Sequence, residues 1–271
     1  KMPWGELLSP AIDHARRGLT VDWYAALVIA SCTRELAKDA DAAAVFLEDG
    51  QWPTISGWTA LAEKRLDQSR MADSLDQIAR HGARALYDGD LGAAMARDVQ
   101  DKGGCLSRDD LQAYRAEFHA PLDFAYRDAR FHVVPGLTAG PTFRDTFASL
   151  ETEDLGSAPG PDSYAAMAAA LKGAYARRLG SMGDTGESPE APGCTTHFSV
   201  VDRHGNMVAQ TQTLLSIFGS RVVSPSTGFL MNNGIMWFDP VQGRPNSLGP
   251  NKRCLMNVCP VIGEQGDKRF A

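Results

Sequence analysis

The chain has 271 residues, of which 44% are hydrophobic and 22% are charged, and it carries a formal net charge of −6 with a pI near 5.5. This composition is typical of a globular protein with one large domain or two small ones. The acidic balance argues against a surface for nucleic acid or anionic membrane, and the sequence has no apolar run long enough to span a bilayer. We therefore expect a small-molecule substrate, with no nucleic acid and no membrane among the partners.

The cysteines bear on disulfides, metal binding and cellular location, and the chain ends bear on truncation. Five cysteines are scattered along the chain and no two form a C-x-x-C pair, which argues against a disulfide framework and a structural zinc site. We expect free thiols, no metal and no cofactor, and a cytoplasmic location is favoured over a periplasmic or secreted one. The chain begins at Lys1 and stops at Ala271 inside an expected strand. We therefore expect truncation at both ends, so that a missing signal peptide is uninformative.

The first half of the chain is predicted to be mainly helical. Hydrophobic spacing predicts helices over residues 7–15, 71–78, 83–99, 107–114 and, further along, 163–179. Gly18 stands where the first helix would end, since glycine is common just past a helix C-terminus. Ser107 is followed by acidic residues in the first turn, which is the signature of a helix N-cap.

The first predicted β-structure covers residues 121–134. Apolar and polar residues alternate there and a turn is expected at 126–128, which predicts a hairpin. A loop rich in proline and glycine is expected over 135–141.

A second hairpin is predicted after an unusual linker. Residues 184–193 are polar and rich in glycine, proline and glutamate, so we expect them to form an exposed, mobile segment. Strands over 195–201 and 207–214 are then expected to flank a turn at 202–206. Further short strands separated by Gly/Pro turns are expected up to residue 262.

The abrupt start of this hairpin makes Thr195 a candidate nucleophile. A threonine hydroxyl needs a base beside it. If the peptide bond between Cys194 and Thr195 is cut, the new α-amine of Thr195, with a pKa near 8, becomes that base. Attack of the hydroxyl on the carbonyl of Cys194, followed by hydrolysis of the resulting ester, would make the cut. The ordinary interpretation is a strand-forming threonine, and composition alone indicates only an α+β domain.

The residues around Thr195 resemble a known family. The run Thr195-Thr-His-Phe-Ser-Val-Val-Asp202, with Gly205-Asn206 and Thr211-Gln-Thr213 after it, is similar to the start of the small subunit of γ-glutamyltransferases. The likeness continues through residues 218–220, 228–233, 238 and 249–253, and residues 1–3, 10–16 and 103–114 are similar to the second half of the large subunit.

This resemblance implies a fold and an activity. The fold is the four-layer αββα sandwich of N-terminal-nucleophile hydrolases, an α+β fold that this chain covers only in part. The protein would be a zymogen that cuts itself between Cys194 and Thr195, so that residues 1–194 end a large subunit and 195–271 begin a small one. Thr195 would be the nucleophile and Thr213 would hydrogen-bond it.

The resemblance also implies partners and a substrate class. Substrates would be γ-glutamyl or related acyl amides, as in glutathione metabolism, with water or an amino acid or peptide as acceptor. The two cleaved subunits would stay together. The Gly-Gly run that supplies the family's oxyanion hole lies outside this chain, so the 271 residues alone are expected to be inactive.

The expected substrate pocket departs from the family's pattern. Its candidate residues are Leu215, Asn233, Gly234, Trp237, Met256 and Asn257. Trp237 replaces an aspartate that binds the α-amine of the substrate, Met256 and Asn257 replace paired serines that bind its α-carboxylate, and Leu215 replaces an asparagine. A charged head group would lose about 1–3 kcal/mol for each unpaired group. An apolar acyl group is therefore favoured, as in cephalosporin-acylase-like members.

Several alternatives stay open. His197 shares a strand face with Thr195, but a packed structural histidine is the ordinary interpretation. A shifted backbone would allow other residues to bind a γ-glutamyl group. A non-catalytic relative that uses the pocket only to bind a ligand or partner is the alternative function.

Overall fold

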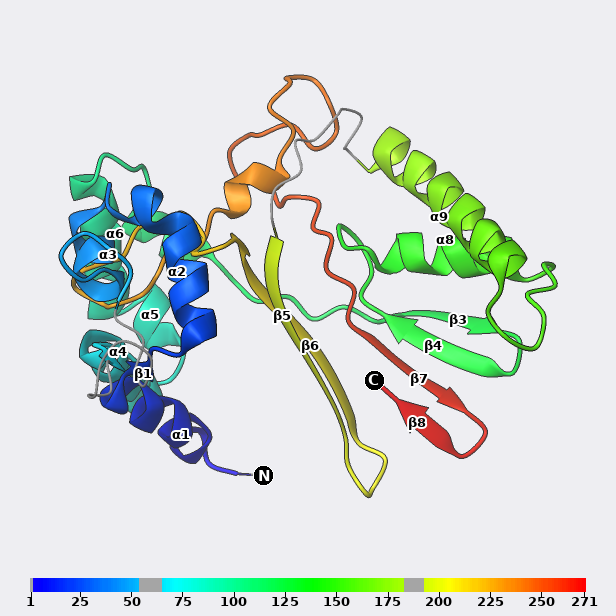
Figure 1. Cartoon of the computed structure of the whole chain (residues 1–271), viewed down its shortest axis with the longest axis horizontal. Helices are drawn as coiled ribbons and strands as arrows, with labels where there is room; N and C mark the ends of the chain where they lie inside the picture. Colours follow the sequence, from blue (N-terminus) through cyan, green and yellow to red (C-terminus); the bar gives the residue numbers. More distant parts are fainter. Residues whose placement is uncertain (1, 54–64, 183–192) are drawn as a thin grey trace. The chain divides into compact units, whose positions relative to one another are not determined.

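The computed structural model describes residues 2–53, 65–182 and 193–271 (Figure 1). The chain divides into two compact units, which are described separately: unit 1 comprises Lys1–Ala116 and Ser216–Asn232, and unit 2 comprises Glu117–Leu215 and Asn233–Ala271. The linker predicted over 184–193 lies, except for Gly193, outside the described residues.

Unit 1 is mainly helical, as the hydrophobic spacing predicts. Its elements are α1 (Trp4–Arg17), β1 (Leu19–Thr20), α2 (Trp23–Leu36), α3 (Ala40–Phe46), β2 (Arg65–Leu66), α4 (Ser69–His81), α5 (Arg84–Tyr87), α6 (Asp90–Asp101) and α7 (Arg108–Ala113). Gly18 follows α1 at φ 73°, as predicted. The N-cap at Ser107 is confirmed as a full capping box, in which its hydroxyl accepts from the Asp110 amide at 3.1 Å and its amide donates to the Asp110 carboxylate at 2.8 Å.

The continuous helix predicted over residues 83–99 is wrong. The chain forms the short α5, leaves the helix at Asp88 and Gly89, and starts again as α6. A Cβ at position 89 would lie 2.6 Å from the carbonyl oxygen of Ala85, so this tight turn needs a glycine. Arg84 pairs with Asp88 across the last turn of α5. Hydrophobic spacing continues through the break because half-buried Leu86 and Tyr87 of α5 pack against the cluster that contains Met95 and Ala96 of α6.

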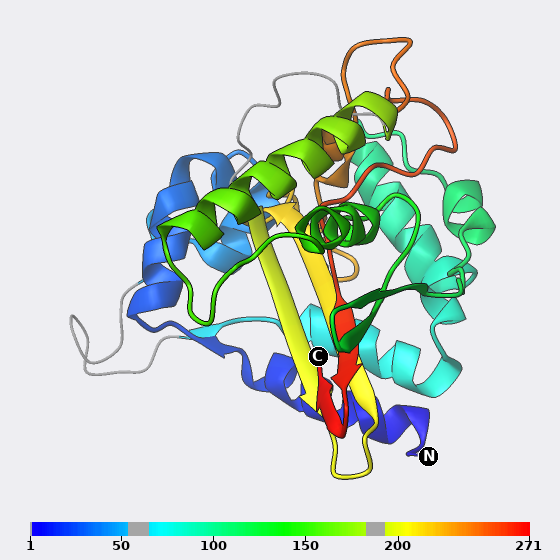
Figure 2. The same cartoon turned by 90° about the vertical axis from the view of Figure 1, so that its right-hand side faces the viewer.

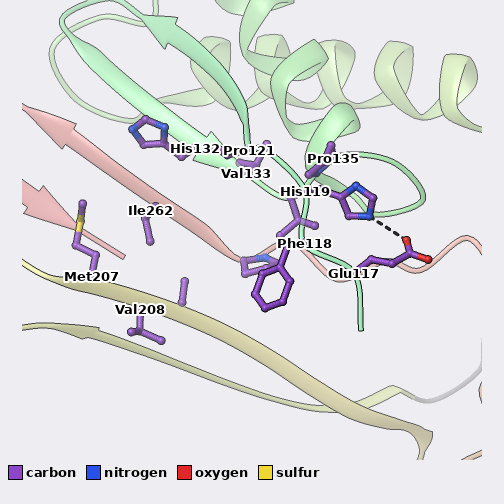
Figure 3. A pocket seen from close by; sticks show the side chains of 13 residues that line it. Glu117, Phe118, His119, Pro121, His132, Val133, Pro135, Met207, Val208 and Ile262 are labelled. Atoms are coloured by element: carbon purple, nitrogen blue, oxygen red, sulfur yellow. Dashed lines mark hydrogen bonds and ion pairs between the residues drawn. The ribbon is translucent and has the colours of Figure 1, made fainter. Parts of the chain in front are cut away.

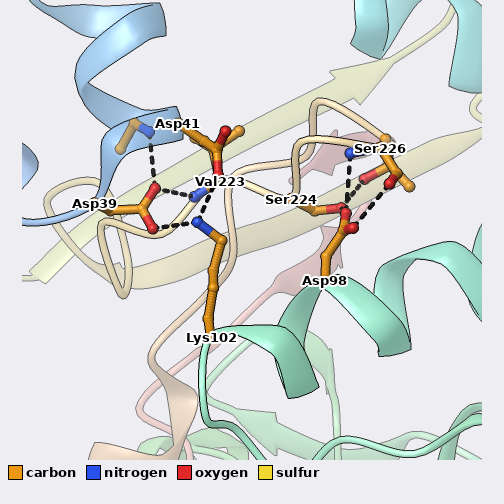
Figure 4. Close-up of polar contacts among 9 residues, drawn as sticks. Asp39, Asp41, Asp98, Lys102, Val223, Ser224 and Ser226 are labelled. Atoms are coloured by element: carbon orange, nitrogen blue, oxygen red, sulfur yellow. Dashed lines mark hydrogen bonds and ion pairs between the residues drawn. The ribbon is translucent and has the colours of Figure 1, made fainter.

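The segment 216–232 belongs to the helical unit although it follows the second hairpin in sequence. Val223 is buried with α2 and α3, while Phe229 and Met231 pack against the buried cluster of Met95, Ala96 and Leu111. The side chain of Asp98 accepts hydrogen bonds from Ser224 and Ser226, and Asp39 binds both Lys102 and the Val223 amide (Figure 4). These contacts fasten the segment to helices that are remote from it in sequence.

Unit 2 contains a four-stranded antiparallel sheet with helices on one face. Strands β3 (Leu122–Tyr126), β4 (Ala129–Val133), β7 (Val261–Gln265) and β8 (Lys268–Phe270) lie in the order β3-β4-β7-β8. Helices α8 (Gly140–Leu150) and α9 (Pro161–Ser181) lie over this sheet (Figures 1 and 2). Phe124 and Phe131 stack at 5.2 Å and meet Phe143 and Phe147 of α8. The first predicted hairpin and the helix predicted over 163–179 are therefore confirmed.

Two expectations for unit 2 and its neighbouring loops need correction. The loop expected over 135–141 ends earlier, because α8 already begins at Gly140 and Pro141 suits its first turn. The short strands expected between residues 215 and 260 are not formed in this described stretch. It contains isolated bridges and a 3₁₀ turn, η1 (Gly234–Trp237), where side chains such as that of Asn246 bind the backbone instead.

The second hairpin forms as predicted. Strand β5 (Gly193–Val201) pairs with β6 (Met207–Ser216), and Gly205 in the turn has φ 80°. Strand β5 begins two residues before Thr195. The hairpin faces the side of the sheet opposite α8, and a cavity lies between them (Figure 3). Unit 2 therefore has successive layers of helices, sheet and hairpin.

Candidate active site

The paired strands bring the hydroxyl groups of Thr195 and Thr213 together. The Oγ1 atom of Thr195 donates to Oγ1 of Thr213 at 3.2 Å, and the next pair along the hairpin, His197 Nδ1 and Thr211 Oγ1, lies at 2.7 Å. The two pairs step by two residues in opposite directions, as antiparallel strands require. Thr195 is exposed and Thr213 is half-buried. The arrangement leaves the Thr195 hydroxyl accessible while one partner orients it.

Leu215 adds a backbone donor to the same hydroxyl pair. Its N–H donates to Oγ1 of Thr213 at 2.8 Å. Its φ of 76° lies in the left-handed region, which is uncommon for a residue other than glycine. The Leu215 side chain is 6% exposed. The candidate pocket residue thus contacts the threonine pair through its backbone.

Asn233 and Gly234 lie beside the end of strand β6. The Asn233 amide donates to the carbonyl oxygen of Leu214 at 3.1 Å, and the Asn233 side chain, buried at 9% exposure, contacts the sulfur of Met236 at 3.1 Å. Gly234 begins η1. The described contacts therefore gather Thr195, Thr213, Leu215 and Asn233 at one end of the hairpin.

Trp237, Met256 and Asn257 belong to a second group of contacts. Trp237 and Met256 are half-buried, and Asn257 is exposed. Buried Asn246 donates to the carbonyl oxygen of Trp237 at 2.6 Å and accepts from the Leu255 amide at 3.0 Å. Asn246 thereby joins the two runs that carry the remaining pocket candidates, and reasoning from the sequence missed it.

Arg178 is a second residue that sequence reasoning missed. It lies on α9 at 6% exposure, and its guanidinium donates to the carbonyl oxygens of Thr138 at 2.6 Å and Met256 at 2.7 Å. It therefore fixes the backbone beside one pocket candidate. Its signal in the sequence is its spacing, since Arg178 continues the buried row of Ala170 and Ala174 at intervals of four.

The cavity between the hairpin and the sheet is a separate feature (Figure 3). It has a volume of about 630 Å³, with walls that include His132, Ile262 and Val208, and its described lining contains neither Thr195 nor Thr213. At its rim, Glu117 binds His119 at 3.0 Å and Arg253 at 2.8 Å. The hydrogen bond from His119 and the charge of Arg253 lower the pKa of Glu117.

The remaining candidates have ordinary surroundings. His197 binds Thr211 and, at 3.1 Å, Ser199, both along the hairpin surface. Burial raises the pKa of the Cys254 and Cys259 thiols, which disfavours their reactive thiolate form. The side chain of Cys194 lies outside the described residues. Across residues 2–53, 65–182 and 193–271, no group of three or more His, Cys, Asp or Glu side chains is placed to bind a metal ion, and no helix is long and apolar enough to cross a membrane.

Solved structures identify the fold. The chain aligns with a cephalosporin acylase from Bacillus halodurans with a TM-score of 0.83 at 23% identity, covering 99% of this chain and 55% of that one. It aligns with the γ-glutamyltranspeptidase of Helicobacter pylori with a TM-score of 0.59 at 21% identity, covering 66% and 50%. These proteins are N-terminal-nucleophile hydrolases, so the predicted fold class is confirmed.

Sequence comparison narrows the class to a family. The sequence profile described as Gamma-glutamyltranspeptidase matches residues 1–192 and 185–271. The chain is 32% identical to the acylase ACY 1 proenzyme of Pseudomonas sp. (strain V22), covering 100% of this chain and 54% of that protein. It is 30% identical to the glutathione hydrolase proenzyme of Escherichia coli (strain K12), covering 96% and 53%. The chain therefore belongs to the γ-glutamyltranspeptidase family. It spans about half the length of the curated relatives that it matches.

Proposed function

We propose that the full-length protein is an autoprocessing N-terminal-threonine amidohydrolase or acyltransferase with Thr195 as its nucleophile. The observation that carries the proposal is the 3.2 Å hydrogen bond between Thr195 and Thr213 near the start of β5. Two relatives are named proenzymes, which supports maturation by cleavage. No feature of the described residues supports the alternative of a non-catalytic binding protein.

The proposed maturation is an N-to-O acyl shift at Thr195. The Thr195 hydroxyl oxygen attacks the carbonyl carbon of Cys194, the bond from that carbon to the Thr195 nitrogen breaks, and the nitrogen takes up a proton. The product is an ester, which water hydrolyses to a carboxylate at Cys194 and a restored hydroxyl at Thr195. Residues 1–194 and 195–271 then belong to different chains, and Thr195 has a free α-amine.

The mature site would use the two groups of Thr195 together. The α-amine, with an ordinary pKa near 8, accepts the hydroxyl proton as the oxygen attacks a substrate amide. The amine product leaves with a proton and the acyl group stays on Thr195 as an ester. Transfer to water completes hydrolysis, and transfer to an amino acid or peptide completes acyl exchange.

We infer that the preferred substrates are small amides whose acyl group has no α-amine. Half-buried Trp237 and Met256 occupy positions where γ-glutamyl-specific relatives are expected to carry charged or polar groups. Neither side chain supplies a countercharge for an ammonium group, so neither can use that group to align the carbonyl with the nucleophile. A similarity of 32% identity to a protein named an acylase agrees with this preference.

Cleavage is tested in the full-length protein by a denaturing gel with N-terminal sequencing of the smaller product. We expect two bands for the wild type, with Thr195 first in the smaller one, and a single uncut chain for Thr195→Ala. Thr196→Ala is the matched control. It removes a hydroxyl from the next residue of the strand but leaves the proposed nucleophile in place, so the chain should still be cut. An intact wild-type chain that still turns over substrate would show that the mechanism is wrong.

Substrate preference is tested with two anilides that differ only in the α-amine. We expect a higher kcat/KM for the glutaryl anilide than for the γ-glutamyl anilide. The triple variant Trp237→Asp, Met256→Ser and Asn257→Ser should shift the ratio towards the γ-glutamyl compound. A wild-type preference for the γ-glutamyl compound would contradict the proposed substrate class and leave the cleavage mechanism untouched.

A further inference from the structure

Asn246 is a buried residue whose side-chain amide forms hydrogen bonds in two directions. It is 5% exposed. Its Nδ2 group donates to the carbonyl oxygen of Trp237 at 2.6 Å, and its Oδ1 atom accepts from the Leu255 amide at 3.0 Å. An asparagine side chain carries a donor and an acceptor side by side, and here each meets a backbone group of the opposite kind. One side chain therefore joins two backbone segments, one nine residues before it and the other nine residues after it.

The backbone of Asn246 is anchored as well. Its carbonyl oxygen accepts from the Asp239 amide at 3.0 Å. The carboxylate of Asp239 is in turn paired with Arg244 at 2.9 Å and accepts from the Val241 amide at 2.8 Å. A side chain that starts from a fixed backbone and is bonded at both polar atoms has little freedom to move. The bridge from Trp237 to Leu255 through Asn246 therefore has a defined length.

The two runs that Asn246 joins are attached to different elements of unit 2. Trp237 ends η1, which begins directly after Asn233, and the Asn233 amide donates to the carbonyl oxygen of Leu214 in strand β6 at 3.1 Å. Trp237 thus belongs with the hairpin that carries the proposed nucleophile.

Met256 is held by other partners. Its amide donates to the carbonyl oxygen of Leu137 at 2.9 Å, and its own carbonyl oxygen accepts from Arg178 of α9 at 2.7 Å. Neither bond involves Trp237, whose link to this run is the Asn246 side chain. The spacing between the two groups of pocket candidates therefore depends on that one side chain.

We infer that Asn246 is a positioning residue for acyl-group selection, because it sets the distance between Trp237 and the pair Met256 and Asn257. The inference rests on the proposed function and deepens it. Asn246 acts through the backbone of its two partners and needs no contact with the substrate. Pocket walls at a fixed separation distinguish acyl chains that differ by one methylene by about tenfold or more, whereas walls that can move apart accept both chains.

The test measures selectivity for acyl-chain length in the full-length, cleaved enzyme. Succinyl, glutaryl, adipyl and pimelyl anilides differ by one methylene at each step, and kcat/KM is measured for each. We expect the wild type to prefer one length over its neighbours by about tenfold or more, and Asn246→Leu, which keeps the volume but removes both hydrogen bonds, by about threefold or less. The ratio of two kcat/KM values does not depend on how much of a preparation is active, so a loss of stability alone leaves it unchanged.

A second variant covers the case in which Asn246→Leu is not recovered folded. Asn246→Asp keeps the volume and the acceptor for the Leu255 amide but loses the donor for the Trp237 carbonyl oxygen. It breaks the bridge on one side only, and the same fall in selectivity is expected.

Ser247→Ala is the matched control, since Ser247 is the next residue and is also 5% exposed. Its hydroxyl likewise makes two hydrogen bonds, to the Val241 carbonyl oxygen at 2.5 Å and from the Arg244 amide at 2.8 Å, but both partners lie in the same loop and neither carries a pocket candidate. Ser247→Ala should therefore keep the wild-type preference for one chain length.

The possible results separate the inference from the proposed function. A wild-type preference that persists in the Asn246 variants, or an equal loss of preference in Ser247→Ala, would overturn the inference. So would a cleaved and active wild type with no preference for chain length, and each of these results leaves the proposed function standing. A wild type that is neither cut nor active on any of the anilides would overturn the proposed function and this inference with it.

Discussion

Arg178 is a charged residue in a position where the pattern of α9 calls for a small apolar one. Burial of a guanidinium is favourable only when its donors are satisfied. Its Nη atoms donate to the carbonyl oxygens of Thr138 and Met256 and, at 3.3 Å, to the hydroxyl of Thr142. One side chain thus ties a helix to two irregular segments, one of which carries a pocket candidate.

We expect Arg178→Met to lower the free energy of unfolding by about 1–3 kcal/mol or more, because buried carbonyl groups lose their donors. Arg177→Met is the matched control, since Arg177 is the exposed neighbour and pairs only loosely with Asp145 at 3.6 Å; it should cost well under about 1 kcal/mol. Urea unfolding of both variants in full-length Thr195→Ala, in which the proposed cut is expected not to occur, measures the difference. Equal costs would show that the buried guanidinium has no special part in stability.

The segment 216–232 is an element without regular structure that is nevertheless closely packed. Gly228 has φ 74°, and a Cβ at this position would lie 2.5 Å from the Met71 nitrogen of α4. Buried Ser74 of the same helix donates to the carbonyl oxygen of Thr227 at 2.8 Å. The backbone of the segment therefore lies directly on α4, and only a glycine fits at position 228.

Replacing Gly228 by alanine should be more destabilising than the same change at Gly205. Both glycines have positive φ, so both variants pay a conformational cost of about 1–2 kcal/mol. A Cβ at Gly205 has open space around it, whereas at Gly228 it meets α4 backbone and adds about 1–3 kcal/mol of overpacking. Thermal unfolding of both variants in the Thr195→Ala background, which is expected to stay uncut, gives the comparison. A Gly205→Ala variant as unstable as Gly228→Ala would contradict the close approach to α4.

At the scale of the whole molecule, lowered carboxyl pKa values recur in both units. They occur at Asp39, Asp67, Asp88, Asp98 and Asp110 in unit 1 and at Glu117, Asp202 and Asp239 in unit 2. For Asp98, burial alone would raise the pKa, but hydrogen bonds from Ser224 and Ser226 outweigh it and the pKa is lowered. The folded chain thus binds these protons more weakly than the unfolded chain does.

We therefore expect the protein to lose stability in acid. A carboxyl group with a lowered folded-state pKa contributes its full stabilisation above its unfolded pKa, near 3.9 for aspartate, and loses it as the pH falls through the folded-state value. The free energy of unfolding should be nearly constant from pH 7 to about 5 and should fall below about 4. Asp98→Asn should be less stable at pH 7 and show a shallower fall, because one linked proton is gone. Urea titrations at several pH values measure both quantities.

Asp101→Asn is the control for this prediction, since Asp101 is an exposed residue of the same helix. It should leave the fall in stability unchanged. An Asp98→Asn curve that runs parallel to the wild-type curve would show that Asp98 contributes nothing to the acid response.

The sequence by itself determined those features that depend on residues near one another in the chain. The capping box at Ser107, the end of α1 at Gly18 and the two hairpins follow from local hydrogen bonding, left-handed glycine and alternation of side chains. The resemblance that begins with the run from Thr195 to Asp202 and continues along the chain predicts the family and implies that Thr213 hydrogen-bonds Thr195, which cross-strand pairing allows.

Only the tertiary structure decided features that depend on distant segments. The left-handed φ of Leu215 has no signal in the sequence, because a leucine by itself does not favour that region. The role of Arg178 depends on carbonyl groups that lie 40 and 78 residues away in the chain. Local propensity describes what each residue favours by itself, whereas these positions are set by partners that the chain brings together only on folding.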